Sequence, residues 1–183
     1  MASRYTLQEG EKTITAIDEL IYRDATLQDL ERIVEIYNST ISSRMVTADT
    51  EPVSVESRIR WFREHTPNKR PLWAIENKNS EIIGWVSFQS FYGRPAYDAT
   101  IELSIYLDVA HRSKGLGKQV LRHAIDEAPK FGVKTILGYI FAHNEPSIKL
   151  FKRFGFEVWA TLPNIASLDG VERSLKIFGK RIA

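Results

Sequence analysis

A glycine-containing loop constrains the fold of this chain more than any other feature. It reads Arg112-Ser113-Lys114-Gly115-Leu116-Gly117-Lys118. It follows an apolar, strand-like run over 101–109 and opens a helix-like run over 116–128. The first amides of such a helix have no partner within it and carry partial positive charge, so they attract anions. The two glycines let a pyrophosphate approach the backbone, while the arginine and the two lysines add charge. The segment predicts a phosphate-binding loop between a strand and a helix.

The spacing of the loop excludes two well-known nucleotide-binding motifs. A P-loop has four residues between its glycines and then Lys-Ser or Lys-Thr, whereas one residue separates Gly115 from Gly117 and Gln119 follows Lys118. A dinucleotide-binding loop has a third glycine three residues after the second, where this chain has Val120. The pattern that remains is Arg-x-x-Gly-x-Gly after a strand. A surface turn with solvated lysines is the alternative interpretation.

Length, charge and composition indicate the class of protein. We expect an extension over 1–19 and a single domain over 20–183, because 183 residues suit one domain. The net charge of +2, from 25 basic and 23 acidic residues, is too balanced for a general nucleic-acid binder. The absence of cysteine excludes disulfides and thiolate metal sites, and no His, Asp or Glu spacing indicates a metal. With no spanning run or secretory signal, we expect a cytoplasmic protein that binds no membrane.

Hydrophobic periodicity and capping residues predict a mixed α/β fold. The expected order is a strand at 20–23, helices after Thr26 and Ser54, a hairpin of 72–76 with 81–89, a strand at 97–107, a helix at 116–128, a strand at 135–140, a helix at 146–154, and strands at 157–162 and 171–178. This order predicts a mixed sheet with helices on both faces. The strand-helix-strand unit from 101 to 140 is expected to be a right-handed parallel crossover. The glycine loop then lies at the carboxyl end of a strand, where such sheets bind ligands.

A second motif follows the next strand. Asn144-Glu145-Pro146-Ser147 is typical of a capped helix start, and its place in the order puts it at the same sheet end as the glycine loop. Asn144 is then able to offer its amide to a peptide-like ligand arm. Together, the glycine loop and the run Asn144-x-x-Ser147-x-x-x-Phe151-x-x-x-Gly155-Phe156 resemble two motifs of the GNAT superfamily of N-acetyltransferases, in the right order. The resemblance covers about residues 21 to 178 and implies acetyl transfer from acetyl-CoA to an amine.

Three segments resemble, more narrowly, the phosphinothricin and methionine sulfoximine acetyltransferases. These are Ile36-Tyr37-Asn38, Glu51-Pro52-Val53-Ser54, and Arg94-Pro95-Ala96-Tyr97-x-x-Thr100-Ile101-Glu102 leading into Ser104-Ile105-Tyr106. The resemblance implies a fold with a mostly antiparallel twisted sheet, a small amino-acid acceptor and a homodimer. For acetyl-CoA it implies contacts from the glycine loop, including Ser113, Lys114 and Leu116, from Ile105, Tyr106 and Leu107 at a splayed strand end, and from Asn144 and Ser147.

Glu102 is the candidate catalytic residue. In an alternating strand it shares the polar face with Thr100, Ser104 and Tyr106, so it faces either solvent or a cleft. The strand leads into the phosphate loop, so Glu102 is expected to point to the region where a thioester would lie. The resemblance implies that it is the general base, directly or through water. Burial would raise its pKa towards the working range.

An aromatic loop precedes Glu102 and predicts the acceptor site. Its candidate residues are Phe91, Tyr92, Arg94, Pro95, Ala96 and Tyr97. The resemblance implies that the last three line an amino-acid pocket, and Arg94 is the candidate for the acceptor carboxylate. Such a loop is also typical of a lid on the core. An arginine pair that holds an acidic acceptor in some relatives is not reproduced, and Phe91 and Tyr92 occupy that neighbourhood.

Two alternative functions stay open at this level. One is a protein or peptide Nα-acetyltransferase, which needs an open groove. The other is a non-catalytic acyl-CoA sensor, which needs the glycine loop but not Glu102. Many family members also have a tyrosine that protonates the leaving thiolate where this chain has Phe151, so amide or water assistance, or Tyr106, would take that role.

Overall fold

A computed structural model describes residues 20–112 and 115–183 of the chain. The strands are β1 (Ile21–Asp24), β2 (Leu72–Glu76), β3 (Ile82–Ser90), β4 (Thr100–Leu107), β5 (Thr135–Phe141), β6 (Glu157–Leu168) and β7 (Val171–Arg181). The helices are α1 (Leu30–Ile41), α2 (Val55–Glu64), α3 (Leu116–Glu127) and α4 (Glu145–Arg153). The expected extension over 1–19 and the loop residues Ser113 and Lys114 lie outside the described residues. None of the helices in the described ranges is long and apolar enough to cross a membrane.

The strands form one sheet in the order β1-β2-β3-β4-β5-β7-β6. All neighbouring strands pair antiparallel except β4 and β5, which are parallel. This confirms the predicted mixed, mostly antiparallel sheet with a central parallel pair. Three strands have a boundary that differs from the prediction by more than one residue. β4 begins at Thr100 because a 3₁₀ turn opened by proline occupies Pro95–Tyr97, and β6 and β7 extend into a hairpin longer than their apolar pattern indicated.

Local side-chain bonds explain where two helices begin. The Ser54 hydroxyl accepts a hydrogen bond of 3.2 Å from the Ser57 amide at the start of α2, as its position predicted. Thr26 does not cap α1 directly. It opens a 3₁₀ turn over Leu27–Asp29, and the Asp29 carboxylate bonds back to the Thr26 amide at 2.7 Å. Asp29 also pairs with Arg23 of β1 at 2.7 Å, so this turn ties α1 to the edge of the sheet.

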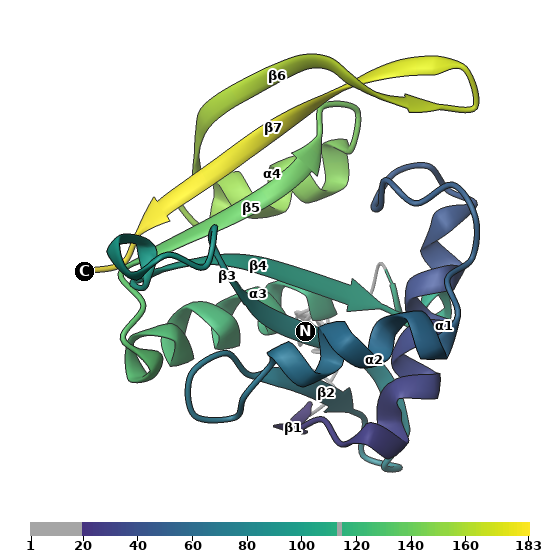
Figure 1. Cartoon of the computed structure of the whole chain (residues 1–183), viewed down its shortest axis with the longest axis vertical. Helices are drawn as coiled ribbons and strands as arrows, with labels where there is room; N and C mark the ends of the chain where they lie inside the picture. The colour runs from purple at the N-terminus through teal and green to yellow at the C-terminus, as the bar shows by residue number, and fades with distance from the viewer. Residues whose placement is uncertain (1–19, 113–114) are drawn as a thin grey trace, which may run out of the picture.

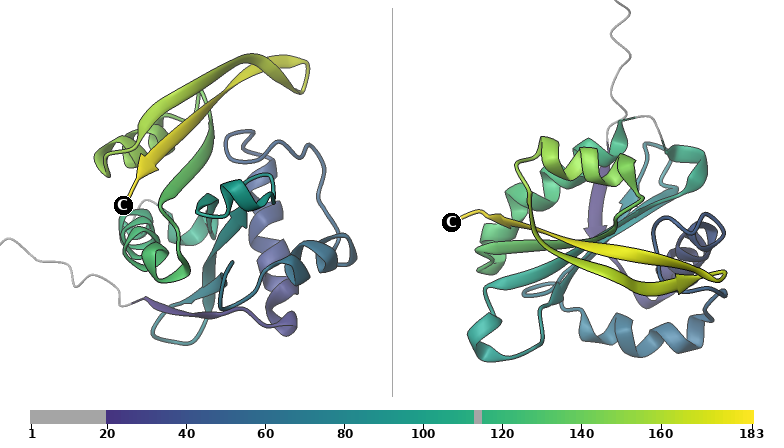
Figure 2. Two further views of the ribbon diagram at one scale, coloured as in Figure 1. Left: turned by 60° about the vertical axis from the view of Figure 1, so that its left-hand side comes forward. Right: turned by 90° about the horizontal axis from the view of Figure 1, so that it is seen from above.

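The helices cover both faces of the sheet. Figure 2 shows α1 and α2, in blue, on the opposite side of the sheet from α3 and α4, in green. Two hydrophobic cores correspond to these layers. The larger one packs α3 and α4 against one face through residues such as Ile101, Leu121 and Phe178. The smaller one packs α1 and α2 against the other face around Trp85, whose indole donates to the Ile33 carbonyl at 3.1 Å.

The two parallel strands separate soon after they begin. β4 and β5 pair only from Thr100 with Thr135 to Glu102 with Leu137. Beyond that point β4 stays bonded to β3 as far as Leu107, and β5 stays bonded to β7 as far as Phe141. Figure 1 shows the two strands diverging towards their carboxyl ends. Alternate backbone groups of both strands therefore face an opening rather than a neighbouring strand.

Close packing at Gly138 holds one wall of this opening. A Cβ atom added there would lie 2.4 Å from the Cε1 atom of Phe151, which reaches β5 from α4. Gly138→Ala should therefore overpack the site and lower the free energy of unfolding by about 1–3 kcal/mol in urea titrations. Phe151→Leu in the same chain should recover part of the loss. Purely additive effects of the two substitutions would contradict this packing.

Candidate active site

Two cavities meet at Glu102. The larger, of about 470 Å³, extends along the opening between β4 and β5 towards the start of α3. The smaller, of about 200 Å³, lies between the sheet and the helices α1 and α2. Glu102, Ser104 and Tyr106 line both. The predicted alternation along β4 is confirmed, since these side chains face the cavities whereas Ile101 and Leu103 are buried in the core on the other face.

Glu102 is a partly buried carboxyl group that forms no ion pair with the described residues. It lies on β4 opposite Gln89 of β3 and Leu137 of β5. Burial raises the pKa of Glu102 above its ordinary value. Among the described residues no donor forms a hydrogen bond to its carboxylate. A raised pKa makes the ionised carboxylate a stronger base than that of a solvated glutamate.

The larger cavity brings together most of the residues predicted to contact acetyl-CoA. Those that line it are Ile105, Tyr106, Leu107, Arg112, Gly117, Asn144 and Ser147. Gly115 adopts a left-handed conformation, with φ of 81°, immediately before α3, and Lys118 is exposed on the first turn. The Leu116 side chain is buried in the core, so only its backbone faces the loop. Ser113 and Lys114 lie outside the described residues.

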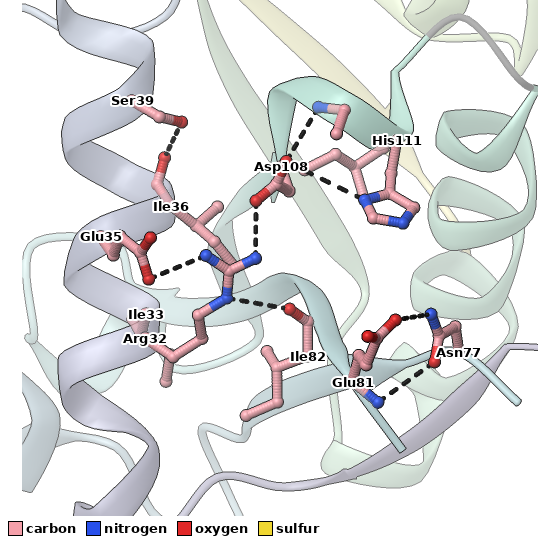
Figure 3. Close-up of polar contacts among 12 residues, drawn as sticks. Arg32, Ile33, Glu35, Ile36, Ser39, Asn77, Glu81, Ile82, Asp108 and His111 are labelled. Atoms are coloured by element: carbon pink, nitrogen blue, oxygen red, sulfur yellow. Dashed lines mark hydrogen bonds and ion pairs between the residues drawn. The ribbon is translucent and has the colours of Figure 1, made fainter. Parts of the chain in front are cut away.

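A partly buried ion pair between Arg32 and Asp108 anchors the segment before the glycine loop. Asp108 directly follows β4 and accepts a hydrogen bond of 2.8 Å from the Ala110 amide. Arg32 of α1 donates to the other Asp108 oxygen at 2.6 Å and to the Ile82 carbonyl at 3.1 Å (Figure 3). Arg112 in turn donates from Nε to the Leu107 carbonyl at 2.9 Å. These bonds hold the backbone that leads from β4 into the loop against α1 and β3.

Asn144 joins two distant parts of the chain. Its side-chain oxygen accepts from the Ser147 amide at 3.2 Å and caps α4, as predicted. Its side-chain nitrogen donates to the Met45 carbonyl at 2.9 Å. The neighbouring His143 adds a contact of 2.8 Å between its Nε2 atom and the Arg44 carbonyl oxygen. The predicted contact of Asn144 with a ligand therefore has to use its second amide hydrogen, because the first holds the loop between α1 and α2.

The loop between α1 and α2 lines the site, and sequence reasoning missed it. Its residues 45–48 form part of the wall of the larger cavity. Thr47 in this segment contacts the Tyr37 hydroxyl, which also donates a hydrogen bond to Asp49. Asp49 also pairs with Arg58 of α2 at 2.8 Å. No local pattern marked residues 45–48, because they reach the site only when α1 and α2 pack on the sheet.

The smaller cavity is lined by aromatic and apolar side chains together with polar and charged ones. Trp85 and Tyr106 stack with their ring centroids 4.4 Å apart, and Trp61 meets Trp85 edge-on at 5.5 Å. Ile33, Val34, Tyr37, Arg58, Ser87 and Gln89 complete the lining together with Glu102 and Ser104. Of the described residues that form this lining, Arg58 is the one basic residue and Glu102 the one carboxylic acid.

The predicted acceptor residues of the aromatic loop lie outside the two cavity linings. Phe91, Tyr92 and Tyr97 pack on one another with ring centroids 4.6 to 6.2 Å apart, and Tyr92 is 78% exposed. Arg94, Pro95 and Ala96 are also exposed. The loop is held at its base by Arg70, which donates to Ser90 at 2.8 Å and to the Asp98 carbonyl at 2.6 Å. These residues stay candidates for acceptor contacts.

Three aromatic residues line the opening, and two of them carry a hydroxyl that can donate a proton to a leaving thiolate. Phe151 lines the larger cavity and carries no hydroxyl. Tyr106 and Tyr139 line it too, and burial raises the pKa of both. Both phenols are therefore protonated at neutral pH.

Comparison with known proteins identifies the family. A model described as the acetyltransferase (GNAT) family matches residues 30–156. The chain belongs to the GNAT acetyltransferases. It is 50% identical over 161 residues to YwnH of Bacillus subtilis, provisionally named a phosphinothricin acetyltransferase, covering 88% of this chain and 98% of that one.

Two further relatives of this acetyltransferase are named for amino-acid acceptors. The L-amino acid N-acyltransferase MnaT of Escherichia coli is 30% identical over 148 residues, covering 81% of this chain and 86% of that one. The L-methionine sulfoximine/L-methionine sulfone acetyltransferase of Pseudomonas aeruginosa is 29% identical with the same coverage.

Solved structures agree with the fold of this acetyltransferase. A crystal structure provisionally named a phosphinothricin N-acetyltransferase has a TM-score of 0.88 and 50% identity, covering 90% of this chain and 99% of that one. YncA of Salmonella typhimurium, solved with acetyl-CoA, has a TM-score of 0.82 and 27% identity, covering 90% and 95%.

The raised pKa of Glu102 predicts a pH-dependent cost to stability. A carboxyl group whose pKa is higher in the folded than in the unfolded state destabilises the fold once pH exceeds the unfolded value. Glu102→Gln should therefore raise the melting temperature at pH 7 to 8, and the gain should disappear as pH falls below the ordinary glutamate pKa. Thermal unfolding across this pH range tests the assignment. A gain that persists in acid would mean that something other than ionisation is responsible.

Proposed function

We propose that the enzyme transfers an acetyl group from acetyl-CoA to the α-amine of a small amino acid or amino-acid analogue, with Glu102 as general base. The observation that carries the proposal is the position of Glu102 where the two cavities meet. One cavity has the shape and polar edges for acetyl-CoA, and the other has the size for a small acceptor. The amine and the thioester would meet beside the carboxylate.

Acetyl-CoA would occupy the larger cavity. The helix start at Gly115 and Gly117, with Arg112 and Lys118, offers amides and charge for the pyrophosphate. Unpaired backbone groups of β4 over 103–107 offer partners for the amide-rich arm and for the thioester carbonyl. The YncA structure with acetyl-CoA supports this placement by homology.

Glu102 would make the acceptor nucleophilic. An alkylammonium ion has no free electron pair, so it has to lose a proton before its nitrogen can attack the thioester carbon. The partly buried, unpaired carboxylate takes that proton, directly or through water. The new C–N bond forms as the C–S bond breaks, and the thiolate takes up a proton from a protonated phenol or from water. General-base catalysis of this kind is worth about 10²–10⁴-fold, and alignment in the joined cavities adds to it.

The size of the acceptor cavity favours a small molecule over a protein chain. A volume of about 200 Å³ with tryptophan and tyrosine walls suits an amino acid with an apolar body. The names of the Escherichia coli and Pseudomonas aeruginosa relatives point to the same class, with methionine sulfoximine and sulfone as analogues. A homodimer stays a prediction from the family resemblance, and a cytoplasmic location stays a prediction from the sequence.

Gly117→Asp should weaken acetyl-CoA binding by about tenfold or more, because the helix start would carry a negative charge beside the pyrophosphate. Isothermal titration calorimetry measures the change. Gly117→Ala is the matched control, since its Cβ meets Leu150 at 3.3 Å without adding charge and should weaken binding less. Equal affinities of a folded Asp variant and the wild type would place the pyrophosphate elsewhere.

Glu102→Gln should lower turnover at neutral pH by about 10²-fold or more, because the amide cannot accept the proton. Acetyl-CoA affinity should stay near the wild-type value. The assay follows thiol release with methionine sulfoximine, methionine sulfone and phosphinothricin. Wild-type activity should also fall as pH drops through the raised pKa of Glu102. Retained turnover in the Gln variant would exclude this base, and activity on peptide N-termini alone would favour the protein acetyltransferase.

A further inference from the structure

We infer that Arg58 binds the anionic group of a zwitterionic acceptor whose amine faces Glu102, and so selects amino acids over simple amines. The inference rests on the proposed function and adds a specificity-determining residue to it. It is carried by the smaller cavity, whose described lining contains one basic residue and one carboxylic acid.

Arg58 is held in place with most of its donors free for a ligand. Its Nη2 atom donates to Asp49 at 2.8 Å, and its guanidinium carbon lies 4.6 Å above the centre of the Tyr37 ring. The ring is itself held by the bond from its hydroxyl to Asp49. Among the described residues neither Nε nor Nη1 of Arg58 has an acceptor. A planar guanidinium that is held on one side and open on another is suited to bind a carboxylate or a phosphinate.

The guanidinium of Arg58 and the carboxylate of Glu102 line the same cavity, and no ion pair between them is formed. Burial raises the pKa of Glu102, and its carboxylate forms no ion pair with a described residue. Arg58 has Asp49 as its ion-pair partner, at 2.8 Å. An acceptor with an ammonium group and an anionic group would satisfy both ends, while its apolar body would lie against Trp61 and Trp85.

Arg58 also fits this role better than Arg94, the candidate from the sequence. Arg94 is exposed and lies outside the lining of either cavity, whereas Arg58 lines the cavity that contains Glu102. The Arg58 side chain is 27% exposed, which keeps the charge close to the bound molecule and partly shielded from water.

The group that Arg58 binds is either the α-carboxylate of the acceptor or an acid at the far end of the acceptor side chain. Four acceptors distinguish these two possibilities. Methionine sulfone has only the carboxylate, and phosphinothricin has both acids. The amine obtained by replacing the carboxyl group of phosphinothricin with hydrogen has only the phosphinate. The amine obtained from methionine sulfone in the same way has neither. Initial rates with saturating acetyl-CoA give kcat and KM for each.

Arg58→Gln should lower kcat/KM about tenfold or more, through KM, for the acceptors with the group that Arg58 binds. The kcat/KM for the amine with neither acid should be unaffected, and so should the KM for acetyl-CoA. Arg58→Lys should recover part of the loss, since it keeps the charge without the planar fork. Arg60→Gln is the matched control on the same helix, because Arg60 is 92% exposed and pairs with Glu64.

The panel distinguishes the failure of the inference from that of the proposed function. A loss with methionine sulfone but not with the amino phosphinate assigns the α-carboxylate, and the reverse assigns the distal acid. Equal losses with all four acceptors, or no loss with any, would overturn the role of Arg58 while leaving the acetyltransferase reaction intact. If the wild-type enzyme acetylates none of the four amines, the proposed function fails and the inference falls with it.

Discussion

The site depends on a parallel strand pairing that stops early. β4 and β5 share only the pairs from Thr100 with Thr135 to Glu102 with Leu137. Each strand keeps its outer neighbour beyond that point, so the sheet stays intact while its centre opens. Buried backbone groups need hydrogen-bond partners, and those facing the opening have to find them in solvent or in a ligand. The opening therefore offers backbone hydrogen-bonding groups to a bound molecule such as the acetyl-CoA that we propose for it.

Long-range polar contacts keep the walls of the opening in place. Arg32 and Asp108 tie the end of β4 to α1, on one side of the larger cavity. Asn144 and the backbone of Met45 tie the start of α4 to the loop between α1 and α2, on the other side. The pair of Arg44 with Asp169 at 2.7 Å adds a contact between that loop and the turn of the β6–β7 hairpin. Elements that cover opposite faces of the sheet thus become parts of one site.

The Glu102 side chain lowers the stability of the folded chain. A strand side chain in its position would stabilise the fold more as an apolar residue or as a carboxylate paired with a cation. Its raised pKa records the cost of burial without that partner. Such local conflicts are expected at functional sites, which agrees with the role of general base that we propose for Glu102.

The sequence by itself determined the order of the elements, the glycine loop before α3, the cap of α4 and the face of β4 that carries Glu102. These features depend on neighbours in the chain, through side-chain alternation, capping bonds and backbone freedom. Only the tertiary structure decided what surrounds Glu102. Arg58, Tyr37 and residues 45–48 reach the site through helix packing and through bonds between residues far apart in the chain, and no local pattern records such contacts. For the same reason the aromatic loop, adjacent to Glu102 in the chain, lies outside both cavity linings, while Arg58 of α2 lines the same cavity as the carboxylate.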